Sequence, residues 1–271
     1  MATRPAHFIS DPDGNFHPTE NARSRWGDDM LNGPAVVSLA AFTLEQRFGL
    51  PEFLPARLTV DLFKAARRVP TTVRVRLIRD GRRIRNSECD VLQGEAIVAR
   101  ATMVQYRLSE PPPGEEWMAH TEFTPAGRWR PARLLHRQRR CRLARRRGGR
   151  APEHVPQTRL PLPDRCGRRS RHHPFVRTVV VAEATSLVSN LGTKGIGYIN
   201  GDLTVALSRL PQSEHIGVQG DSHWTSEGIS VGAGTLFDDA GPFATGLVTA
   251  IANPAAQIDF SKPDTIPTLN V

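Results

Sequence analysis

Cysteine is scarce in this 271-residue chain, and its three cysteines, Cys89, Cys141 and Cys166, show no CxxC spacing. A sparse, odd-numbered set does not indicate a disulfide framework. No stretch approaches the roughly eighteen consecutive apolar residues of a membrane-spanning helix. The first residues, MATRPAHFISDPDG, lack the apolar core of a signal peptide. We therefore expect a cytoplasmic protein with no membrane insertion.

Signatures of cofactor sites are also missing. The glycines of GTKGIG and SVGAGT lack the strand-turn-helix context of a phosphate-binding loop. No Ser-His-Asp set has support from a motif. A metal site built from Cys141, Cys166, His172 and His173 would have a spacing that fits no usual zinc pattern. The sequence predicts neither a metal ion nor an organic cofactor.

Positive charge is concentrated in one segment. Residues 128–171 hold sixteen Arg, no Lys and only two acids, which gives +14 and leaves −5 of the total of +9 for the rest of the chain. An Arg cluster can neutralise nucleic-acid phosphates. Trp129 is the one aromatic residue there that could stack on bases, so the stacking part of that signature is poor. We do not expect nucleic acid to be the partner.

The Arg-rich segment can also be a basic linker without a core, because it lacks periodic apolar residues. It can equally be out-of-frame sequence, since GC-rich DNA read in the wrong frame yields Arg, Pro, Ala, Gly and His. A one-base shift of a possible coding sequence for Glu153 to Leu162 gives a plausible strand, and recognisable sequence resumes at Pro174. We favour the frameshift, and expect residues 128–173 to be poorly packed and the second sheet to have an unfilled edge.

The first half reads as one helix followed by strands. From Asn32, the run NGPAVVSLAAFTLEQRFG has Gly33 as a possible cap, Pro34 in the first turn and apolar residues at helical spacing, which predicts a helix with one apolar face. Period-two alternation follows in ARLTVDLF, TTVRVRLIRDGRRIRNSECDV and EAIVARATMVQYRL. The Asp80-Gly81 and Gln93-Gly94 pairs predict hairpin turns.

The same order returns after the Arg-rich segment. VVVAEATSLVSNLG predicts one helix ended by Gly192, and four strand patterns follow between residues 198 and 252, with turns at Glu227-Gly228 and around Asp239 to Gly241. The phrase LTVDL at residues 58–62 is matched by LTVAL at residues 203–207. This indicates an internal repeat of helix and sheet, hence an α+β fold.

The quoted helices and strands, with FVRTVVVAEATSLVSNLG and YINGDLTVALSRLP, resemble the double-hotdog superfamily around acyl-CoA thioesterase II. The resemblance implies a tandem (double) hotdog in which an antiparallel sheet wraps a long helix in each half. It covers residues 5–125 and 174–253. We expect an N-terminal hotdog at 1–125, the Arg/Pro-rich segment at 126–174, a C-terminal hotdog at 175–254 that is incomplete at its start, and a tail at 255–271.

In such thioesterases a carboxylate acts as general base for a water molecule, with hydrogen-bonding partners to orient it. The family places an Asp on the second-half helix, a Thr before the following strand and a Gln on the last strand. These positions fall at Thr185, Asn200 and near Gly246 to Val248. Thr185 cannot take a proton from water at neutral pH. Asn32, Gly33 and Gly246 are expected to lie at the substrate groove.

The remaining candidate bases fit ordinary structural roles. Glu183 is two residues from Thr185, about 200° around a continuous helix, and should point away from it. Asp202 fits a strand-start residue that bonds backbone groups. His223 and Trp224 alternate along a strand, so we expect one of them in the core or the groove. Glu45 fits a solvated helix face.

The resemblance implies a protein that binds acyl-CoA or a related acyl thioester, with hydrolysis in doubt because the family's acid and amide are replaced. A non-catalytic acyl-binding or scaffolding protein is the alternative, and nucleic-acid binding through the Arg-rich segment is a third. Self-association into a homo-oligomer is compatible with this fold.

Overall fold

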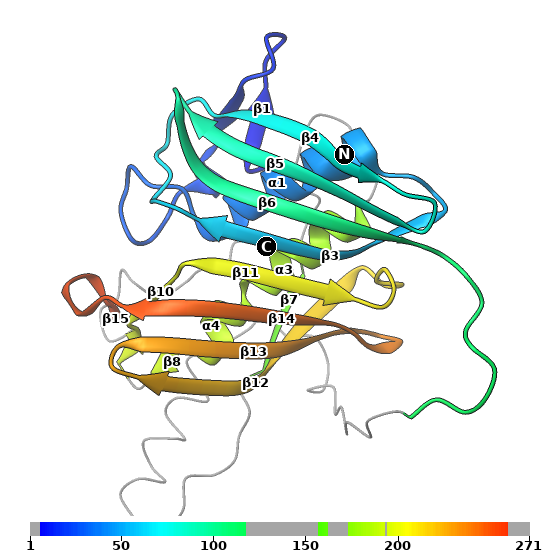
Figure 1. Cartoon of the computed structure of the whole chain (residues 1–271). Coiled ribbons are helices and arrows are strands. Elements are labelled where there is room, and N and C mark those ends of the chain that lie inside the picture. Colours follow the sequence, from blue (N-terminus) through cyan, green and yellow to red (C-terminus); the bar gives the residue numbers. More distant parts are fainter. Residues whose placement is uncertain (1–5, 118–156, 162–172, 193, 260–271) are drawn as a thin grey trace, which may run out of the picture.

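The computed structural model describes residues 6–117, 157–161, 173–192 and 194–259, arranged as two helix-and-sheet units (Figure 1). The elements of the first unit are β1 (Phe8–Ser10), β2 (Phe16–Pro18), η1 (Glu20–Ala22), α1 (Gly33–Phe48), β3 (Phe53–Leu62), β4 (Thr72–Asp80), β5 (Ile84–Gln93) and β6 (Ala96–Arg107). Those of the second are β7 (Gln157–Pro161), α3 (Pro174–Glu183), α4 (Thr185–Ser189), β8 (Leu191–Gly192), β9 (Gly195–Ile196), β10 (Tyr198–Asn200), β11 (Asp202–Leu207), β12 (His215–Ser226), β13 (Ile229–Asp238), β14 (Gly241–Ala252), η2 (Pro254–Ala256) and β15 (Ile258–Asp259).

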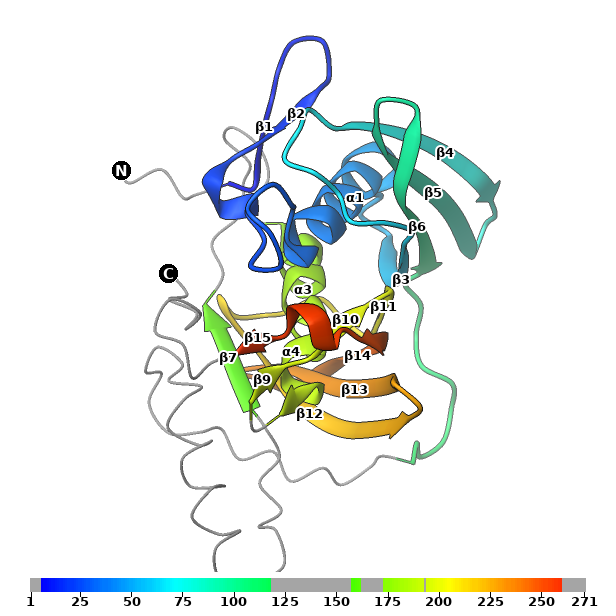
Figure 2. The same cartoon turned by 90° about the vertical axis from the view of Figure 1, so that its left-hand side faces the viewer.

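Helix α1 forms where the sequence predicts it, but its N-cap is Asn32 and not the predicted Gly33, which is the first helical residue. The Asn32 side chain accepts a hydrogen bond from the Ala35 N–H at 2.8 Å, and a proline occupies the first turn. Every residue from Ala35 to Leu44 is buried. The expectation of one apolar face is therefore too narrow, because the helix is enclosed by the sheet on one side and by α3 on another (Figure 2).

The second-half helix differs from its prediction. The single helix expected over residues 179–192 is two helices, because α3 ends at Glu183 and α4 starts at Thr185, with Ala184 as the junction. Gly192 does not cap a helix but lies in β8, and Asn190 follows α4. The backbone at Ala184 stays right-handed helical, with φ −66° and ψ −6°, and its N–H donates to the Val181 carbonyl at 3.0 Å, so the junction is a single tightened turn.

The two units use the same strand order. In the first, the order is β4-β5-β6-β3, and in the second it is β12-β13-β14-β11, so each strand of one unit has a counterpart in the other. The predicted turn at Glu227-Gly228 is present with positive φ at both residues, and Gly94 and Gly241 also adopt positive φ at their turns. The internal repeat read from the sequence corresponds to this repeated topology.

One continuous sheet joins the units through β3 and β11, which pair antiparallel. Thr59 lies opposite Thr204, and their hydroxyl oxygens are 3.3 Å apart. These threonines hold the same place in the shared phrases LTVDL and LTVAL. On either side of them, Leu58 pairs with Val205 and Val60 pairs with Leu203, so each flanking pair joins the leucine of one phrase to the valine of the other. The repeat therefore meets itself at an approximate twofold axis between Thr59 and Thr204.

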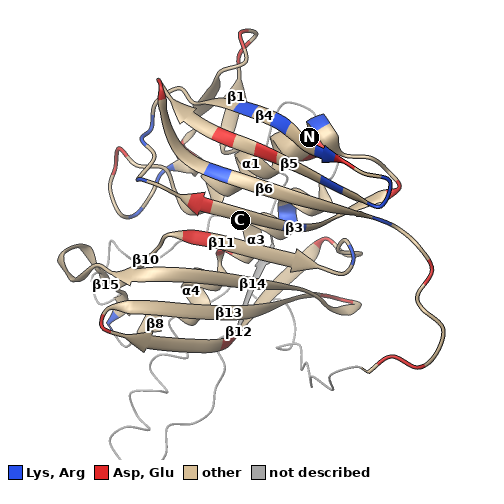
Figure 3. Cartoon of the chain, in the orientation of Figure 1, with Lys and Arg blue, Asp and Glu red and all other residues tan. Residues whose placement is uncertain are grey.

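The helices cover one face of the sheet and leave the other face open. Buried side chains of α1, α3 and the strands beneath them form one hydrophobic cluster that includes residues of both units. Figure 3 shows that the open face carries charged residues over β3 to β6 and few over β12 to β14. The described part of the chain contains no helix long and apolar enough to span a membrane.

The expectation for the Arg-rich segment is corrected at one place. Gln157–Pro161 forms β7 and pairs with His215–Gln219 of β12, so the second sheet's edge is covered there rather than unfilled. Apart from residues 157–161 and 173, the segment to which the frameshift and linker hypotheses apply lies outside the described ranges. Cys141, Cys166 and His172 of the discounted metal site also lie outside them. Among the described residues no group of three His, Cys, Asp or Glu side chains could hold a metal ion.

Candidate active site at the helix pair

A buried carboxylate lies where the end of α3 meets the start of α1. Glu183 is the last residue of α3 and is 7% exposed. Its carboxylate sits against the backbone of Gly33, so closely that a methyl group on Gly33 would overlap the carboxylate oxygen Oε1. Only glycine permits this approach, although the backbone conformation itself would accept other residues. Gly33 is thus at the candidate site for a steric reason.

Asn200 is the polar partner of this carboxylate. Its Nδ2 group donates to Glu183 Oε1 at 3.5 Å, from the end of β10. Burial raises the pKa of Glu183 to about 7, and the Asn200 hydrogen bond opposes part of that rise. A carboxylate with this pKa exchanges protons near neutral pH, as a general base must.

The first turn of α1 presents backbone donors at the same place. Asn32 is fully used as a cap, since its amide also donates to the carbonyl oxygens of Asn21 at 2.8 Å and Arg23 at 3.2 Å. Pro34 has no N–H, and the Ala35 N–H is taken by Asn32. The Gly33 N–H makes no hydrogen bond within the described residues, and the positive end of the helix dipole lies beside it. Asn32 therefore serves the helix, and Gly33 offers the donor.

Thr185 and Gly246 are brought together where α4 packs on β14. A methyl group on Gly246 would overlap the Thr185 hydroxyl, and Gly234 is also a close neighbour of Thr185. The Thr185 hydroxyl is buried and has no hydrogen-bond partner among the described residues. The three positions carried over from the family thus separate into Thr185 with Gly246 at the sheet, and Asn200 with Glu183 at α1.

Sequence reasoning missed Glu183 because it asked whether Glu183 shares a face with Thr185. Glu183 and Thr185 have different neighbours, as their spacing predicts, but Glu183 has a polar partner of its own in Asn200. One signal was present in the sequence. Glu183 is the single acid in the otherwise apolar run VVVAEA, where an unpaired charge is costly.

Asp202 has a structural role, and His223 and Trp224 lie outside the core. Asp202 accepts hydrogen bonds from the Thr249 N–H at 2.8 Å and from the Thr249 hydroxyl, which confirms a strand-start residue that bonds its neighbour strand. The expectation that His223 or Trp224 lies in the core is wrong. Both are exposed, Trp224 at 70%, because the end of β12 extends beyond the helices.

Glu45 is not on a solvated helix face. Its carboxylate is 2.8 Å from His173 Nδ1, and the two side chains are only 22% and 27% exposed. His173 precedes α3, and its ring packs edge-on against Phe42 at 5.4 Å. This ion pair ties the end of α1 to the start of α3, at the opposite end of the helix pair from Glu183.

Similar proteins agree with this architecture. Residues 22–106 match the model of the acyl-CoA thioesterase N-terminal domain. A structure described as having a hot dog fold, a protein of unknown function from Alicyclobacillus acidocaldarius, superposes with a TM-score of 0.61 at 12% identity, over 90% of this chain and 95% of that one. The protein has the hotdog fold.

Structures with thioesterase names also superpose over most of the chain. A candidate thioesterase II from Thermobifida fusca has a TM-score of 0.67 at 12% identity, covering 93% of this chain and 99% of its own. An acyl-CoA thioesterase II from Mycobacterium marinum has a TM-score of 0.54 at 15% identity, covering 82% and 88%. No sequence among curated proteins matches the chain. At these identities the superpositions carry the hotdog fold and no specific activity.

Proposed function

We propose that this chain is a tandem hotdog thioesterase that hydrolyses acyl-CoA or a related acyl thioester, with Glu183 as the general base. The observation that supports this most is the buried Glu183 carboxylate against Gly33, with Asn200 beside it and a pKa raised to about 7. The domain match at residues 22–106 supports the substrate class. The repeated topology around Thr59 and Thr204 supports the tandem arrangement.

Glu183 and Asn200 would handle water. Ionised Glu183 takes a proton from a water molecule held between the carboxylate and the Asn200 amide, while the water oxygen attacks the thioester carbonyl carbon. The carbon–sulfur bond then breaks, and Glu183 returns the proton to the departing thiolate. The products are a carboxylic acid and a free thiol, and no cofactor is consumed.

The start of α1 would stabilise the charge that develops on the carbonyl oxygen. The Gly33 N–H lacks an acceptor within the described chain, and the helix dipole adds positive potential at this end. A donor held in place by a capped helix needs no reorganisation during the reaction. Removing one such donor commonly costs roughly 10²–10³ in rate.

A binding protein without hydrolysis is the second candidate, and one observation favours it. The family positions for the acid and the amide hold Thr185 and Gly246, which pack tightly against each other. That packing leaves no space for an amide side chain at position 246. The two candidates differ in one measurable property, whether Glu183 turns over an acyl thioester.

The test is acyl-CoA hydrolysis by the full chain and by Glu183→Gln. We expect the variant to lose roughly 10²–10⁴ in kcat/KM, the usual contribution of a general base. Glu45→Gln, at the other end of the helix pair, is the matched control and should keep the wild-type rate. In the wild type, kcat/KM should rise with pH up to about 7 and then level off, as Glu183 ionises. Wild-type activity in Glu183→Gln would refute the assignment, and no turnover by the wild type would favour the binding protein.

A further inference from the structure

A pocket of about 700 Å³ opens beside the loop that follows β3. Its lining residues are Lys64, Ala65, Arg67, Val69, Gln93, Gly94 and Val98. The Gln93 side chain fastens the loop, because its Oε1 accepts from the Arg67 N–H at 2.8 Å and its Nε2 donates to the Arg67 carbonyl at 2.6 Å. We call this the loop pocket, and its volume is that of a small-molecule site.

Backbone hydrogen bonds connect both ends of the loop that lines this pocket to residues close in sequence to Asn200 and Gly33. At one end, the Leu62 N–H donates to the Gly201 carbonyl at 2.8 Å, next to Asn200. At the other end, the Ala66 carbonyl accepts a hydrogen bond at 2.8 Å from the N–H of Leu31, which lies two residues before Gly33. The pocket loop is therefore tied by hydrogen bonds to the segments that carry Asn200 and Gly33.

The charges at the loop pocket are positive. Lys64 is exposed and makes no ion pair within the described residues, and no acidic residue lines the pocket. Arg67 pairs with Asp29, but both side chains are more than half exposed, so that pair is weak and can give way to a stronger anion. Val69 and Val98 supply an apolar wall behind the two cations.

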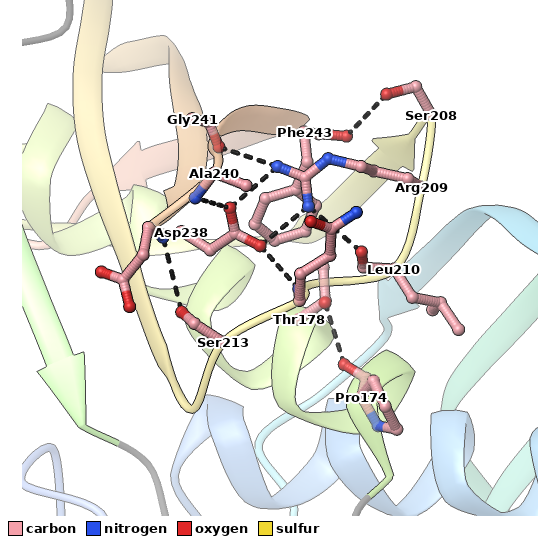
Figure 4. Close-up of polar contacts among 12 residues, drawn as sticks. Pro174, Thr178, Ser208, Arg209, Leu210, Ser213, Asp238, Ala240, Gly241 and Phe243 are labelled. Atoms are coloured by element: carbon pink, nitrogen blue, oxygen red, sulfur yellow. Dashed lines mark hydrogen bonds and ion pairs between the residues drawn. The ribbon is translucent and has the colours of Figure 1, made fainter.

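The equivalent place in the second unit is occupied. Asp238, which ends β13 as Gln93 ends β5, accepts two hydrogen bonds from Arg209 at 2.8 Å and one from the Gln212 N–H at 2.7 Å (Figure 4). The Arg209 guanidinium also lies over the Phe243 ring at 5.1 Å. Here the loop after β11 is closed on the β13–β14 turn by an ion pair. The loop pocket thus has cations and no acid among its lining residues, whereas the second unit has a matched ion pair at the equivalent place.

We propose that the loop pocket binds the phosphate groups of the coenzyme A portion of the substrate, through Lys64 and Arg67. This rests on the proposed thioesterase function and adds the position of the nucleotide end. The phosphates sit at the cations, the adenine or pantetheine chain lies on Val69 and Val98, and the thioester reaches the start of α1.

The experiment measures hydrolysis of an acyl-CoA and of the same acyl group on N-acetylcysteamine, a thioester without phosphates. For Lys64→Ala we expect KM for acyl-CoA to rise about 10-fold, and more for Lys64→Glu, with kcat unchanged. The phosphate-free substrate should be hydrolysed equally by all of these proteins. Arg82→Ala, an exposed cation at the β4–β5 turn, is the control and should change neither KM.

Binding of adenosine 3′,5′-bisphosphate, measured by calorimetry, separates this inference from the proposed function. Bisphosphate binding that Lys64→Glu abolishes, in a protein that hydrolyses nothing, would uphold the loop pocket and refute the thioesterase. Acyl-CoA hydrolysis whose KM is no more sensitive to Lys64→Glu than to Arg82→Ala would refute the loop pocket and leave the thioesterase standing. If the chain neither binds the bisphosphate nor hydrolyses a thioester, both are wrong.

Discussion

The loops after β3 and β11 occupy equivalent places in the two units but are held by different chemistry. In the first unit the neutral Gln93 amide holds the loop, and a pocket with Lys64 and Arg67 remains. In the second, buried Asp238 and Arg209 close the same place. One topology can therefore leave a pocket in one copy and close the same place in the other, because the side chains at the strand ends decide which.

The open sheet faces show a second contrast between the units. In the first, Asp90 is almost buried between Arg74 and Arg100, with hydrogen bonds of 3.0 and 2.6 Å. The corresponding face of the second carries exposed Leu247 and Ile251 and few charges (Figure 3). Ion pairs hold the outer face of one unit, whereas the other relies on the buried side beneath α3 and α4.

The sharpest test of the loop contrast compares Asp238→Ala with Gln93→Ala. We expect Asp238→Ala to lower the free energy of unfolding by about 3–5 kcal/mol, because it removes four hydrogen bonds and leaves Arg209 unpaired. Gln93→Ala should cost about 1–2 kcal/mol, since its amide bonds are partly exposed. Urea unfolding at pH 7 measures both. Equal losses would mean that the two loops are fastened equally well.

The two ends of the helix pair can be compared through Glu183→Gln and Glu45→Gln. The folded pKa of Glu183, about 7, exceeds the ordinary 4.5, so its stability contribution is full below pH 4.5 and is lost as pH rises through 7. Glu183→Gln should therefore stabilise the protein by about 3 kcal/mol at pH 8 and hardly at pH 4. Glu45→Gln should show no such gain, because it breaks the His173 ion pair. Thermal unfolding across this pH range decides, and a gain for both would remove the contrast.

A smaller effect is expected at the charged sheet face. Hydrogen bonds from Arg100, the larger cause, and from Arg74 lower the pKa of Asp90. Asp90→Asn should cost about 1–2 kcal/mol at pH 7, and the difference from the wild type should shrink as pH falls below 3.8, where the unfolded carboxyl takes up its proton. Denaturant unfolding measures this loss, and Thr249→Val, on the open sheet face of the second unit, is the comparison variant. If the loss of stability in Asp90→Asn did not depend on pH, the charge of Asp90 would not be the source of its stabilising effect.

Much of the fold was predictable because its signals are local. The early proline and the apolar spacing identify α1, although its cap is Asn32 rather than the predicted Gly33, and alternation identifies the strands from β3 to β6. The shared phrase around Thr59 and Thr204 indicated the repeat, and the structure pairs these two residues. The break at Ala184 was not predictable, because the apolar spacing continues through it and the packing of α4 on β12 and β13 imposes the change.

The sequence predicted individual residues of the candidate site but not their arrangement. Gly33 and Asn200 were identified from their positions in the resemblance, but their common neighbour Glu183 was set aside. That contact joins the start of α1, the end of α3 and β10, and no periodicity within one segment can report it. Likewise, His173 and Glu45 are 128 residues apart and meet only because the two helices pack side by side.

The axis between Thr59 and Thr204 has a consequence for how such a chain can change over generations. If the units were separate identical subunits, every substitution would occur twice, and a residue useful at one end would be forced on the other. Joined in one chain, position 93 is an amide while position 238 is a carboxylate, and Glu183, the base that we propose, needs no second copy elsewhere. Covalent linkage has thus freed each half to specialise separately.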